Sequence, residues 1–298
     1  MEYIKINEKE FKFVVGTGKD YKFRKSFNTL TEKTFGFNFE SWYQNGYWKN
    51  KYIPYSLMDG DVVVSNVSVS TMDFDVFGKT KRYIQLGTVM TDVKYRNQGL
   101  LRIIIERVIA EWKDKCELIY LFANNSVLDF YPKFGFNKLQ EYQYSKLINK
   151  KEECGFARKL DMSNEQDKAL VYSKANNSCS LSKIYMHGNV ELIMFYCTLF
   201  MKNNAYYIED YDAVVIAEFK EDTIEVLDVF CTKENSLDKI LNCLINENIK
   251  REKLYFTPKE IESYTIMPLE GEDTLFILGK DTKLLAENQF MFPKLSHT

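Results

Sequence analysis

The sequence predicts an α/β protein with two units in tandem, each a mixed sheet flanked by helices. Runs of strand-forming residues alternate with segments of helical periodicity along most of the 298 residues. The order strand–helix–strand at 83–123 follows two hairpin-like turns, which predicts one parallel pair within an otherwise antiparallel sheet. A similar order of elements recurs after the polar stretch 149–155, although the sequences differ. We therefore infer a duplication joined by a linker.

The first unit is interpreted element by element. Residues 1–50 are predicted to be helical and irregular, and strands follow at 53–60, 61–74 and 81–93, with turns at Asp59-Gly60 and Gly78. Residues 98–112 place apolar side chains at spacings of three and four, which predicts an amphipathic helix. A strand at 117–124, a helix at 126–134 and a returning strand at 135–147 complete the unit.

The second unit is predicted to begin with a helix at 163–175. Strands are expected near 189–200 and at 205–210, 212–220 and 223–231. A helix at 236–247 and strands at 253–258 and 275–280 follow, and the apolar segment 288–292 is predicted to be strand-like and packed.

Composition excludes several classes of protein. A net charge of −2 argues against tight nucleic-acid binding. The start of the chain lacks the apolar core of a signal peptide, and the longest apolar run contains Glu191 and is too short for a bilayer, so we expect a cytoplasmic protein with no membrane partner. The only histidines are His187 and His297, which argues against a His-rich zinc site and against most Ser–His or Cys–His catalytic arrangements. The six cysteines contain no C-x-x-C pair, so reduced, mostly buried thiols are expected.

A glycine turn carries the first chemical signal. The stretch YRNQGLL at 95–101 places Gly99 between the strand 81–93 and the helix that follows. Free backbone N–H groups and the positive end of a helix dipole suit an anion such as a pyrophosphate. The alternative is a helix start that merely needs a flexible residue. The candidate anion-binding residues are Arg96, Asn97, Gln98, Gly99, Leu100 and Leu101.

A second motif lies downstream, where Tyr131, Lys133, Gly135 and Phe136 follow Asn124. Taken with Arg96 and Gly99, this order and spacing resembles the GNAT superfamily of N-acetyltransferases. The G-L-L ending at Leu101, where the family pattern has a small residue, is similar to the enhanced intracellular survival subgroup. There a second, acetyltransferase-like domain follows the first. The subgroup's third, sterol-carrier-like domain has no room in 298 residues, which leaves its particular substrate and oligomer open.

The resemblance implies specific roles for residues of this chain. It implies a catalytic GNAT domain at 1–148 that uses acetyl-CoA as co-substrate and no metal, followed by a GNAT-like domain at 154–298. The backbone of Val89, Met90 and Thr91 would bind the pantetheine arm, as an added strand does. Asn124 would contact the same arm, or serve only as a turn or cap residue.

Tyr131 is the candidate catalytic residue. The resemblance implies that it protonates the departing thiolate, and a phenol and a thiol have comparable pKa values. The alternative is an aromatic packing role. The base is open between a water-mediated path and four acidic candidates, which are Glu40, Asp73, Asp75 and Asp129. The early aromatics form either an amine-binding wall or ordinary core. They are Phe37, Trp42, Tyr43, Trp48 and Tyr52.

The second unit is predicted to be degenerate. The turn after its strand 223–231 has neither glycine nor arginine and carries Glu234, whose charge would repel a pyrophosphate. Pro293 is expected to end the strand-like segment, and Lys294–Thr298 follow it as a short tail. In the enhanced intracellular survival subgroup, the C-terminal carboxylate reaches the active site of the first domain. There it belongs to the third, sterol-carrier-like domain, for which this sequence has no room. A carboxylate at Thr298 in the same cleft and an ordered surface tail therefore both stay open.

These features predict an enzyme that transfers acetyl from acetyl-CoA to a primary amine of a small molecule or a peptide. The alternatives are a non-catalytic sensor that binds acetyl-CoA and a scaffold of two pseudo-domains. Tyr131 favours the enzyme because a sensor needs no proton donor. The acceptor and the oligomeric state are not determined by the sequence.

Overall fold

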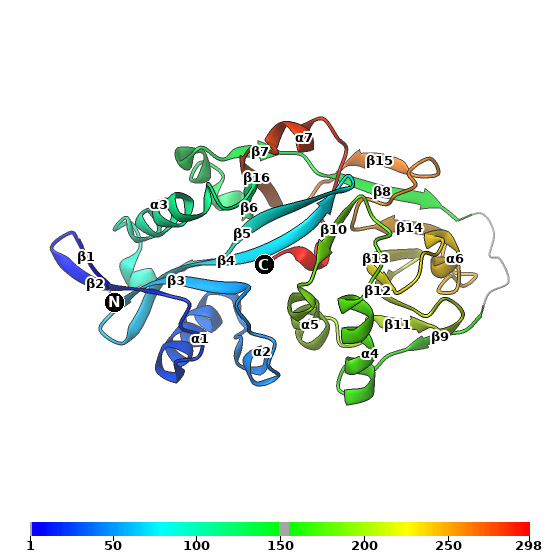
Figure 1. The fold of residues 1–298 in the computed structure, drawn as a ribbon, viewed down its shortest axis with the longest axis horizontal. Coiled ribbons are helices and arrows are strands. Elements are labelled where there is room, and N and C mark those ends of the chain that lie inside the picture. The colour runs from blue at the N-terminus through cyan, green and yellow to red at the C-terminus, as the bar shows by residue number, and fades with distance from the viewer. Residues whose placement is uncertain (1, 149–154) are drawn as a thin grey trace.

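The computed structural model describes residues 2–148 and 155–298, and it shows two mixed sheets side by side along the long axis of the molecule (Figure 1). The predicted α/β class, with two mixed sheets flanked by helices, is confirmed. The predicted linker at 149–155 lies outside the described residues except for Gly155.

The first sheet has nine strands in the described chain. Along the sheet they run β1 (Glu2–Ile6), β2 (Lys9–Val15), β3 (Tyr52–Asp59), β4 (Val62–Val76), β5 (Lys79–Thr91), β6 (Leu118–Asn124), β16 (Asp273–Gly279) and β7 (Asn137–Leu139), and β10 (Ile184–His187) pairs with β4. The second sheet has seven strands, in the order β15 (Thr265–Pro268), β8 (Tyr142–Leu147), β14 (Arg251–Leu254), β13 (Thr223–Cys231), β12 (Ala213–Lys220), β11 (Ala205–Ile208) and β9 (Ala157–Lys159).

The two sheets have the same strand arrangement, and each sheet contains a strand from the other half of the chain. In the first sheet an antiparallel β4–β5 pair leads to a parallel β5–β6 pair, and in the second β12–β13 leads to β13–β14 in the same way. A β-bulge interrupts the antiparallel pair in both sheets. The strand that follows β6 is β16, from the end of the chain, and the strand that follows β14 is β8, from its first half. This reciprocity supports the inferred duplication, while the domain limits 1–148 and 154–298 stay a prediction.

Helices cover both faces of the first sheet. α1 (Tyr21–Phe35) begins at Asp20, whose side chain accepts hydrogen bonds from the amides of Lys22 and Phe23, and it ends at Gly36 with φ 78°. α1 and α2 (Glu40–Gln44) lie on one face. α3 (Leu100–Trp112) covers the other, and its buried stripe is Leu100, Ile104, Ile105 and Val108.

The second unit adds α4 (Glu165–Asn176), α5 (Val190–Leu199), α6 (Leu237–Asn242) and α7 (Thr282–Ala286). The strand predicted near 189–200 is wrong, because that segment forms α5. Its side chains are apolar on nearly every side and most are buried, so helical periodicity is missing from the sequence. The Phe195 ring stacks on Phe39 of the first unit, with centroids 5.2 Å apart. α5 is thus packed between the two units.

Other element predictions need correction. Residues 2–15 form the β1–β2 hairpin, and 126–134 forms two short 3₁₀ turns in place of a helix. The strand predicted at 135–147 is two strands in different sheets, because the chain crosses between the units at Gln140-Glu141. Residues 288–292 are not a strand. They are nevertheless packed as predicted, since Phe290 and Phe292 are fully buried.

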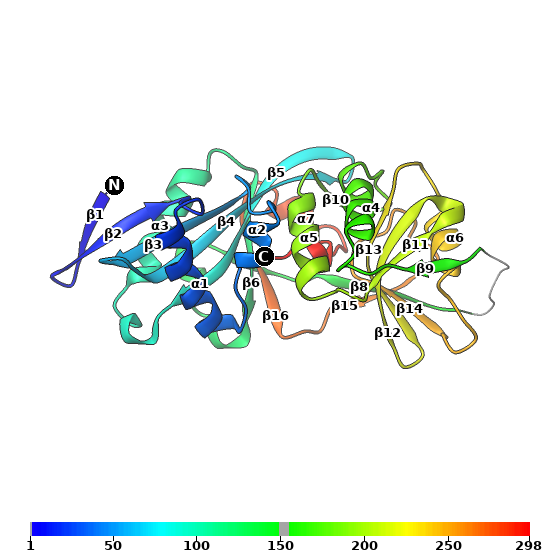
Figure 2. The ribbon, with the colours of Figure 1, turned by 90° about the horizontal axis from the view of Figure 1, so that it is seen from below.

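The C-terminal segment, residues 288–298, runs between the two units. The Phe292 ring stacks on Tyr120 of β6 with centroids 4.6 Å apart, and the C mark lies beside α5 in both views (Figures 1 and 2). Cys243 is disulfide-bonded, so the expectation of reduced thiols is wrong there, whereas Cys116, Cys179, Cys197 and Cys231 are free. Across the described residues, no helix has the length and apolar character needed to cross a membrane.

Candidate active site

A cleft opens where β5 and β6 separate. The two strands pair in parallel only from Tyr83–Leu118 to Gln85–Tyr120, and the rest of β5 diverges from β6. The space between them has a volume of about 710 Å³, and the start of α3 and the turn after β6 close its ends. Separated parallel strands leave backbone groups that a bound molecule can use as a partner strand would.

The divergence of β5 has a local cause in a bulge at Thr88 and Val89. Asn66 pairs with Met90 and Ser68 with Gly87, so β5 holds an extra residue. Thr88 has φ 45°, a conformation that β-branched residues rarely adopt. Buried Asn66 holds the bulge, because its Nδ2 donates to the Thr88 carbonyl at 3.0 Å.

The turn at 96–99 leads from the bulged strand into α3. Arg96 Nε donates to the Thr91 carbonyl at 3.3 Å, and Asn97 and Gly99 have φ 61° and 83°. A Cβ at Gly99 would meet no atom within 4 Å. Gly99 is therefore needed for its left-handed backbone conformation, and not to avoid contact with a neighbouring residue.

The start of α3 is left open for an anion. No side chain caps it, and in the described structure no hydrogen-bond acceptor faces the backbone N–H groups of residues 97–102. These donors and the positive end of the helix dipole both favour a bound negative charge. A pyrophosphate fits this arrangement.

The predicted cofactor residues meet at this cleft, with one exception. The residues lining it include Val89, Met90, Thr91, Arg96, Asn97, Gly99, Leu100, Leu101, Asn124 and Tyr131. Gln98 does not line the cleft. Its side chain donates to the Lys94 carbonyl at 3.1 Å, and its own carbonyl accepts from Asn7. Only its backbone N–H stays a candidate.

Tyr131 lies at the wall of the cleft and is only 4% exposed. Its ring packs against Phe130, Phe136 and Phe276, with centroids 5.3, 6.1 and 5.7 Å away. Burial raises the pKa of its phenol to about 12, so the group carries its proton at neutral pH. Packing and proton donation are compatible at this position.

Asn124 also lines the cleft, and it has a local structural role. Its Oδ1 accepts from the Ser126 amide at 3.1 Å and the Ser126 hydroxyl at 2.5 Å, as a cap residue does. The acceptor atom is therefore used within the turn. The Nδ2 group is left to donate to a bound molecule.

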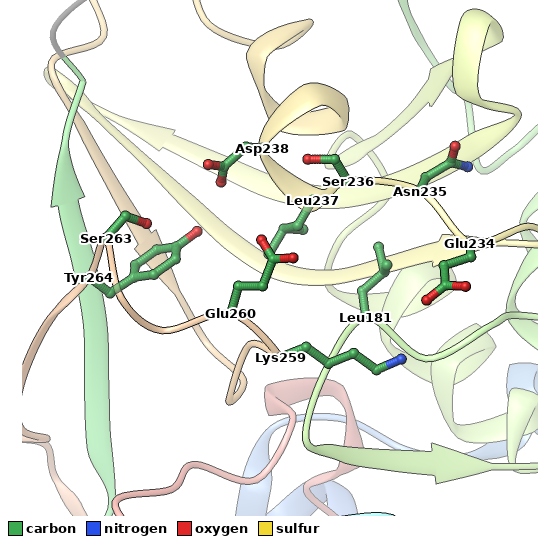
Figure 3. Close-up of a pocket in the computed structure, with 10 residues that line it drawn as sticks. All are labelled: Leu181, Glu234, Asn235, Ser236, Leu237, Asp238, Lys259, Glu260, Ser263 and Tyr264. Carbon is green, nitrogen blue, oxygen red and sulfur yellow. The ribbon is translucent and has the colours of Figure 1, made fainter.

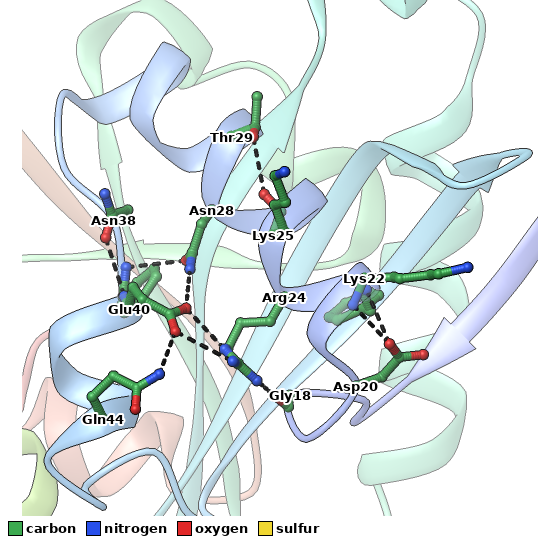
Figure 4. Close-up of polar contacts among 12 residues, drawn as sticks. Gly18, Asp20, Lys22, Arg24, Lys25, Asn28, Thr29, Asn38, Glu40 and Gln44 are labelled. Carbon is green, nitrogen blue, oxygen red and sulfur yellow. Dashed lines mark hydrogen bonds and ion pairs between the residues drawn. The ribbon is translucent and has the colours of Figure 1, made fainter.

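The Glu40 carboxylate is unsuited to a catalytic base. It accepts from Arg24 Nε at 2.8 Å, from Asn28 at 3.0 Å and from Gln44 at 2.6 Å, and Figure 4 shows it enclosed by these groups. The hydrogen bond from Arg24 holds the pKa of Glu40 below its usual range. Arg24 also donates to the Gly18 carbonyl, so the network fastens α2 to the start of α1.

The other acidic candidates also lie away from the cleft. Asp73 pairs with Arg82 at 2.8 Å, which lowers the pKa of the carboxyl, and Asp75 contacts His187 Nε2 at 3.0 Å. Asp129 is exposed. In the described chain no Asp or Glu side chain lines the cleft. Sequence position in the catalytic half was too weak a signal to identify a base.

The early aromatic residues are mostly core. Trp42 and Tyr52 are 4% and 7% exposed and pack with Phe39 and Phe195. Tyr52 connects this core to the cleft, because its hydroxyl lies 2.7 Å from Thr88 Oγ1 in the bulge. The core interpretation therefore fits these two residues.

The sequence left the position of Thr298 open, and the structure places it in the cleft. Thr298 packs on Gly87 of β5, so close that a Cβ on Gly87 would come within 2.7 Å of its backbone. The His297 ring stacks on Phe122 of β6 at 3.7 Å between centroids, and Tyr196 donates to the His297 carbonyl at 2.8 Å. The surface-tail interpretation is wrong for these residues.

Buried polar atoms without partners gather at the same place. Gln85 is fully buried, and neither of its amide atoms has a hydrogen-bond partner among the described residues. The same is true of His297 Nε2 and Thr298 Oγ1. Native structures rarely leave such groups unsatisfied, and Thr298 lines the cleft, so its hydroxyl is suited to bind water or a polar ligand. The sequence carried no signal for the Gln85 amide, because Gln85 is one polar residue in an apolar strand.

The corresponding turn of the second unit differs. A smaller cavity of about 90 Å³ lies beside the start of α6, and Figure 3 shows Glu234, Asp238 and Glu260 around it. The Ser236 side chain caps α6 by accepting from the Lys239 amide. Carboxylates and a capped helix start both disfavour a pyrophosphate. That this unit takes no cofactor stays a prediction.

Comparisons with known proteins agree with this geometry. A family profile described as an acetyltransferase (GNAT) domain matches residues 20–139. No curated protein matches the chain. Residues 20–139 therefore match a GNAT acetyltransferase domain.

Solved structures extend the likeness to most of the chain. A probable N-acyltransferase of unknown function from Enterococcus faecalis is 15% identical, with a TM-score of 0.59 over 89% of this chain and 72% of that one. Eis1 from Mycobacterium abscessus is 12% identical, with a TM-score of 0.55 over 89% and 72%. A GCN5-related N-acetyltransferase from Kribbella flavida is 13% identical, with a TM-score of 0.52 over 90% and 71%. At these identities the likeness establishes the fold.

Proposed function

We propose that this protein transfers the acetyl group of acetyl-CoA to a primary amine of a small molecule or peptide. The observation that carries the proposal is the open start of α3, whose free backbone N–H groups face a cleft between separated parallel strands. A pyrophosphate and an extended arm need these two features together.

The chain's own residues would divide the work as follows. The backbone N–H groups of residues 97–101 and the dipole of α3 hold the pyrophosphate, and Arg96 and Arg102 add positive charge at the same end of the cleft. The backbone of Val89–Thr91, turned by the bulge, holds the pantetheine arm. Asn124 Nδ2 donates to that arm from β6.

Tyr131 would supply the proton. Acetyl-CoA supplies an acetyl thioester: the acceptor nitrogen bonds to the acetyl carbon, the carbon–sulfur bond breaks, nitrogen loses a proton and sulfur gains one. A phenol with a pKa of about 12 is protonated at neutral pH, so Tyr131 holds the proton that the departing sulfur needs. Water bound to the Thr298 hydroxyl, which lines the cleft, would carry the proton that the amine loses.

The test is a thiol-release assay with acetyl-CoA and a panel of primary amines, with products identified by mass. We expect an acetylated amine and free coenzyme A in equal amounts. Acetyl-CoA binding without turnover on any amine would favour the sensor alternative, and absence of binding would overturn the proposal.

A further inference from the structure

An aromatic rim borders the cleft where the two units meet. We define the rim as Phe35 at the end of α1, Phe37 after it, and Phe200 at the end of α5. Phe35 and Phe200 are 43% and 51% exposed. The Phe37 ring lies 6.0 Å from Phe35 and 5.3 Å from Phe200, and Phe35 also lines the cleft. The exposed rings are therefore continuous with the proposed active site.

The rim residues are not needed to cover the hydrophobic core between the two units. Beneath it, Phe39 and Phe195 already stack at 5.2 Å and are 5% and 7% exposed. Phe35 and Phe200 extend beyond that core into solvent. Adjacent exposed aromatic rings beside a cleft mark a surface that binds an apolar group.

The exchanged strand β16 brings one carboxylate beside the cleft. Asp273 begins β16 and pairs with Asn124, and the next same-face pair is Leu275 with Phe122. Asp273 therefore lies on the face of the sheet that carries Phe122. No hydrogen bond or ion pair within the described structure occupies its side chain.

Asp273 also has an electrostatic influence on Tyr196, which is a neighbour of the rim. Burial, and then the charge of Asp273, raises the pKa of Tyr196, whose ring lies 6.2 Å from Phe200. The charged side chains that line the cleft itself are Arg96 and Arg102. Arg96 and Arg102 lie at the end of the cleft proposed for the pyrophosphate, so Asp273 is available to attract an ammonium group beside the rim.

We propose that the acceptor is a primary amine carried on an aromatic or bulky apolar body. The body packs on Phe35, Phe37 and Phe200, while Asp273 attracts the ammonium group toward the cleft. This inference rests on the proposed acetyl transfer and narrows its substrate class. It also gives the second unit a role, because Phe200 and Asp273 both lie in the later half of the sequence.

The first test compares three acceptors by kcat/KM in the thiol-release assay: phenethylamine, n-propylamine and spermine. Burial of the phenyl ring should favour phenethylamine over n-propylamine by about tenfold or more. Spermine should be no better than n-propylamine. A preference for spermine, or no preference between the two monoamines, would overturn the inference while leaving acetyl transfer intact.

The second test assigns the preference to residues. Phe200→Ala should lower kcat/KM for phenethylamine by about tenfold and leave that for n-propylamine unchanged. Phe219→Ala is the control, since Phe219 is 38% exposed on β12 and lies outside the cleft. Asp273→Asn should raise KM for both monoamines without changing acetyl-CoA affinity. Equal effects of the two Phe variants, or no effect of Asp273→Asn, would overturn the assignment, and melting temperatures check that each variant folds.

Discussion

The position of Thr298 can be tested through the glycine beneath it. A Cβ built on Gly87 would lie 2.5 Å from Thr298 Oγ1, 2.6 Å from its backbone oxygen and 2.7 Å from its carbonyl carbon. The hydroxyl can rotate away, but the backbone atoms cannot. Gly87→Ala must therefore push Thr298 out of the cleft or shift β5.

The cost of this change follows from the overlap. Overpacking a filled site by one methyl group costs about 1–3 kcal/mol. In a chain of this size, that corresponds to a fall in melting temperature of about 2–6 °C. Gly271→Ala is the matched control, because a Cβ on Gly271 meets no atom within 4 Å.

A double-mutant cycle separates the contact with Thr298 from other effects of the alanine. Unfolding is measured for the full chain, Gly87→Ala, truncation after His297, and the combination. Because the clash needs Thr298, Gly87→Ala should cost almost nothing in the truncated chain, which gives a coupling of about 1–3 kcal/mol. An equal cost in both backgrounds would refute the placement of Thr298 at Gly87.

Three further outcomes are expected. Tyr131→Phe should keep acetyl-CoA affinity and slow turnover by about two to four orders of magnitude, and unaltered turnover would return Tyr131 to a packing role. Burial raises the pKa of Glu141 from 4.5 to about 7, so its stabilising contribution is complete below pH 4.5 and is lost as pH rises through 7. Glu141→Gln should therefore be more stable than wild type at pH 8, by about 3 kcal/mol at most, and a lower stability there would contradict this reasoning. Gln85→Leu should lower the free energy of unfolding by about 1 kcal/mol because water or a ligand satisfies the amide, whereas an unchanged or raised free energy would contradict that inference.

Much of the first unit could be predicted because its signals are local. The strands at 53–93 show strand-forming residues between clear turns, and the apolar stripe of 98–112 has helical spacing. The turn at Gly99 needs a left-handed residue at a strand–helix junction, which the sequence displays directly. The cleft residues could be predicted from that turn together with the family resemblance, which also depends on Tyr131 and Gly135.

The parts that escaped prediction depend on contacts between distant segments. α5 is apolar on nearly all sides because both units bury it, so no period distinguishes it from a strand. Nothing local to 273–279 shows that this strand pairs with β6, about half the chain earlier. Asp273 comes to lie beside Asn124 only through that exchange, and Thr298 reaches the cleft only through the packed C-terminal segment, so sequence spacing could not place them there.

The account depends most on a single anion-binding helix start, and calorimetric titration with acetyl-CoA tests it directly. Gly99→Asp would place a negative charge at the proposed pyrophosphate site. Gly78→Asp is its matched control, because Gly78 has φ 82° against 83° for Gly99 and a Cβ meets no atom within 4 Å at either position. We predict one site per chain, affinity at least about tenfold weaker in Gly99→Asp, and wild-type affinity in Gly78→Asp. Two equivalent sites per chain, or unchanged affinity in Gly99→Asp, would contradict the account.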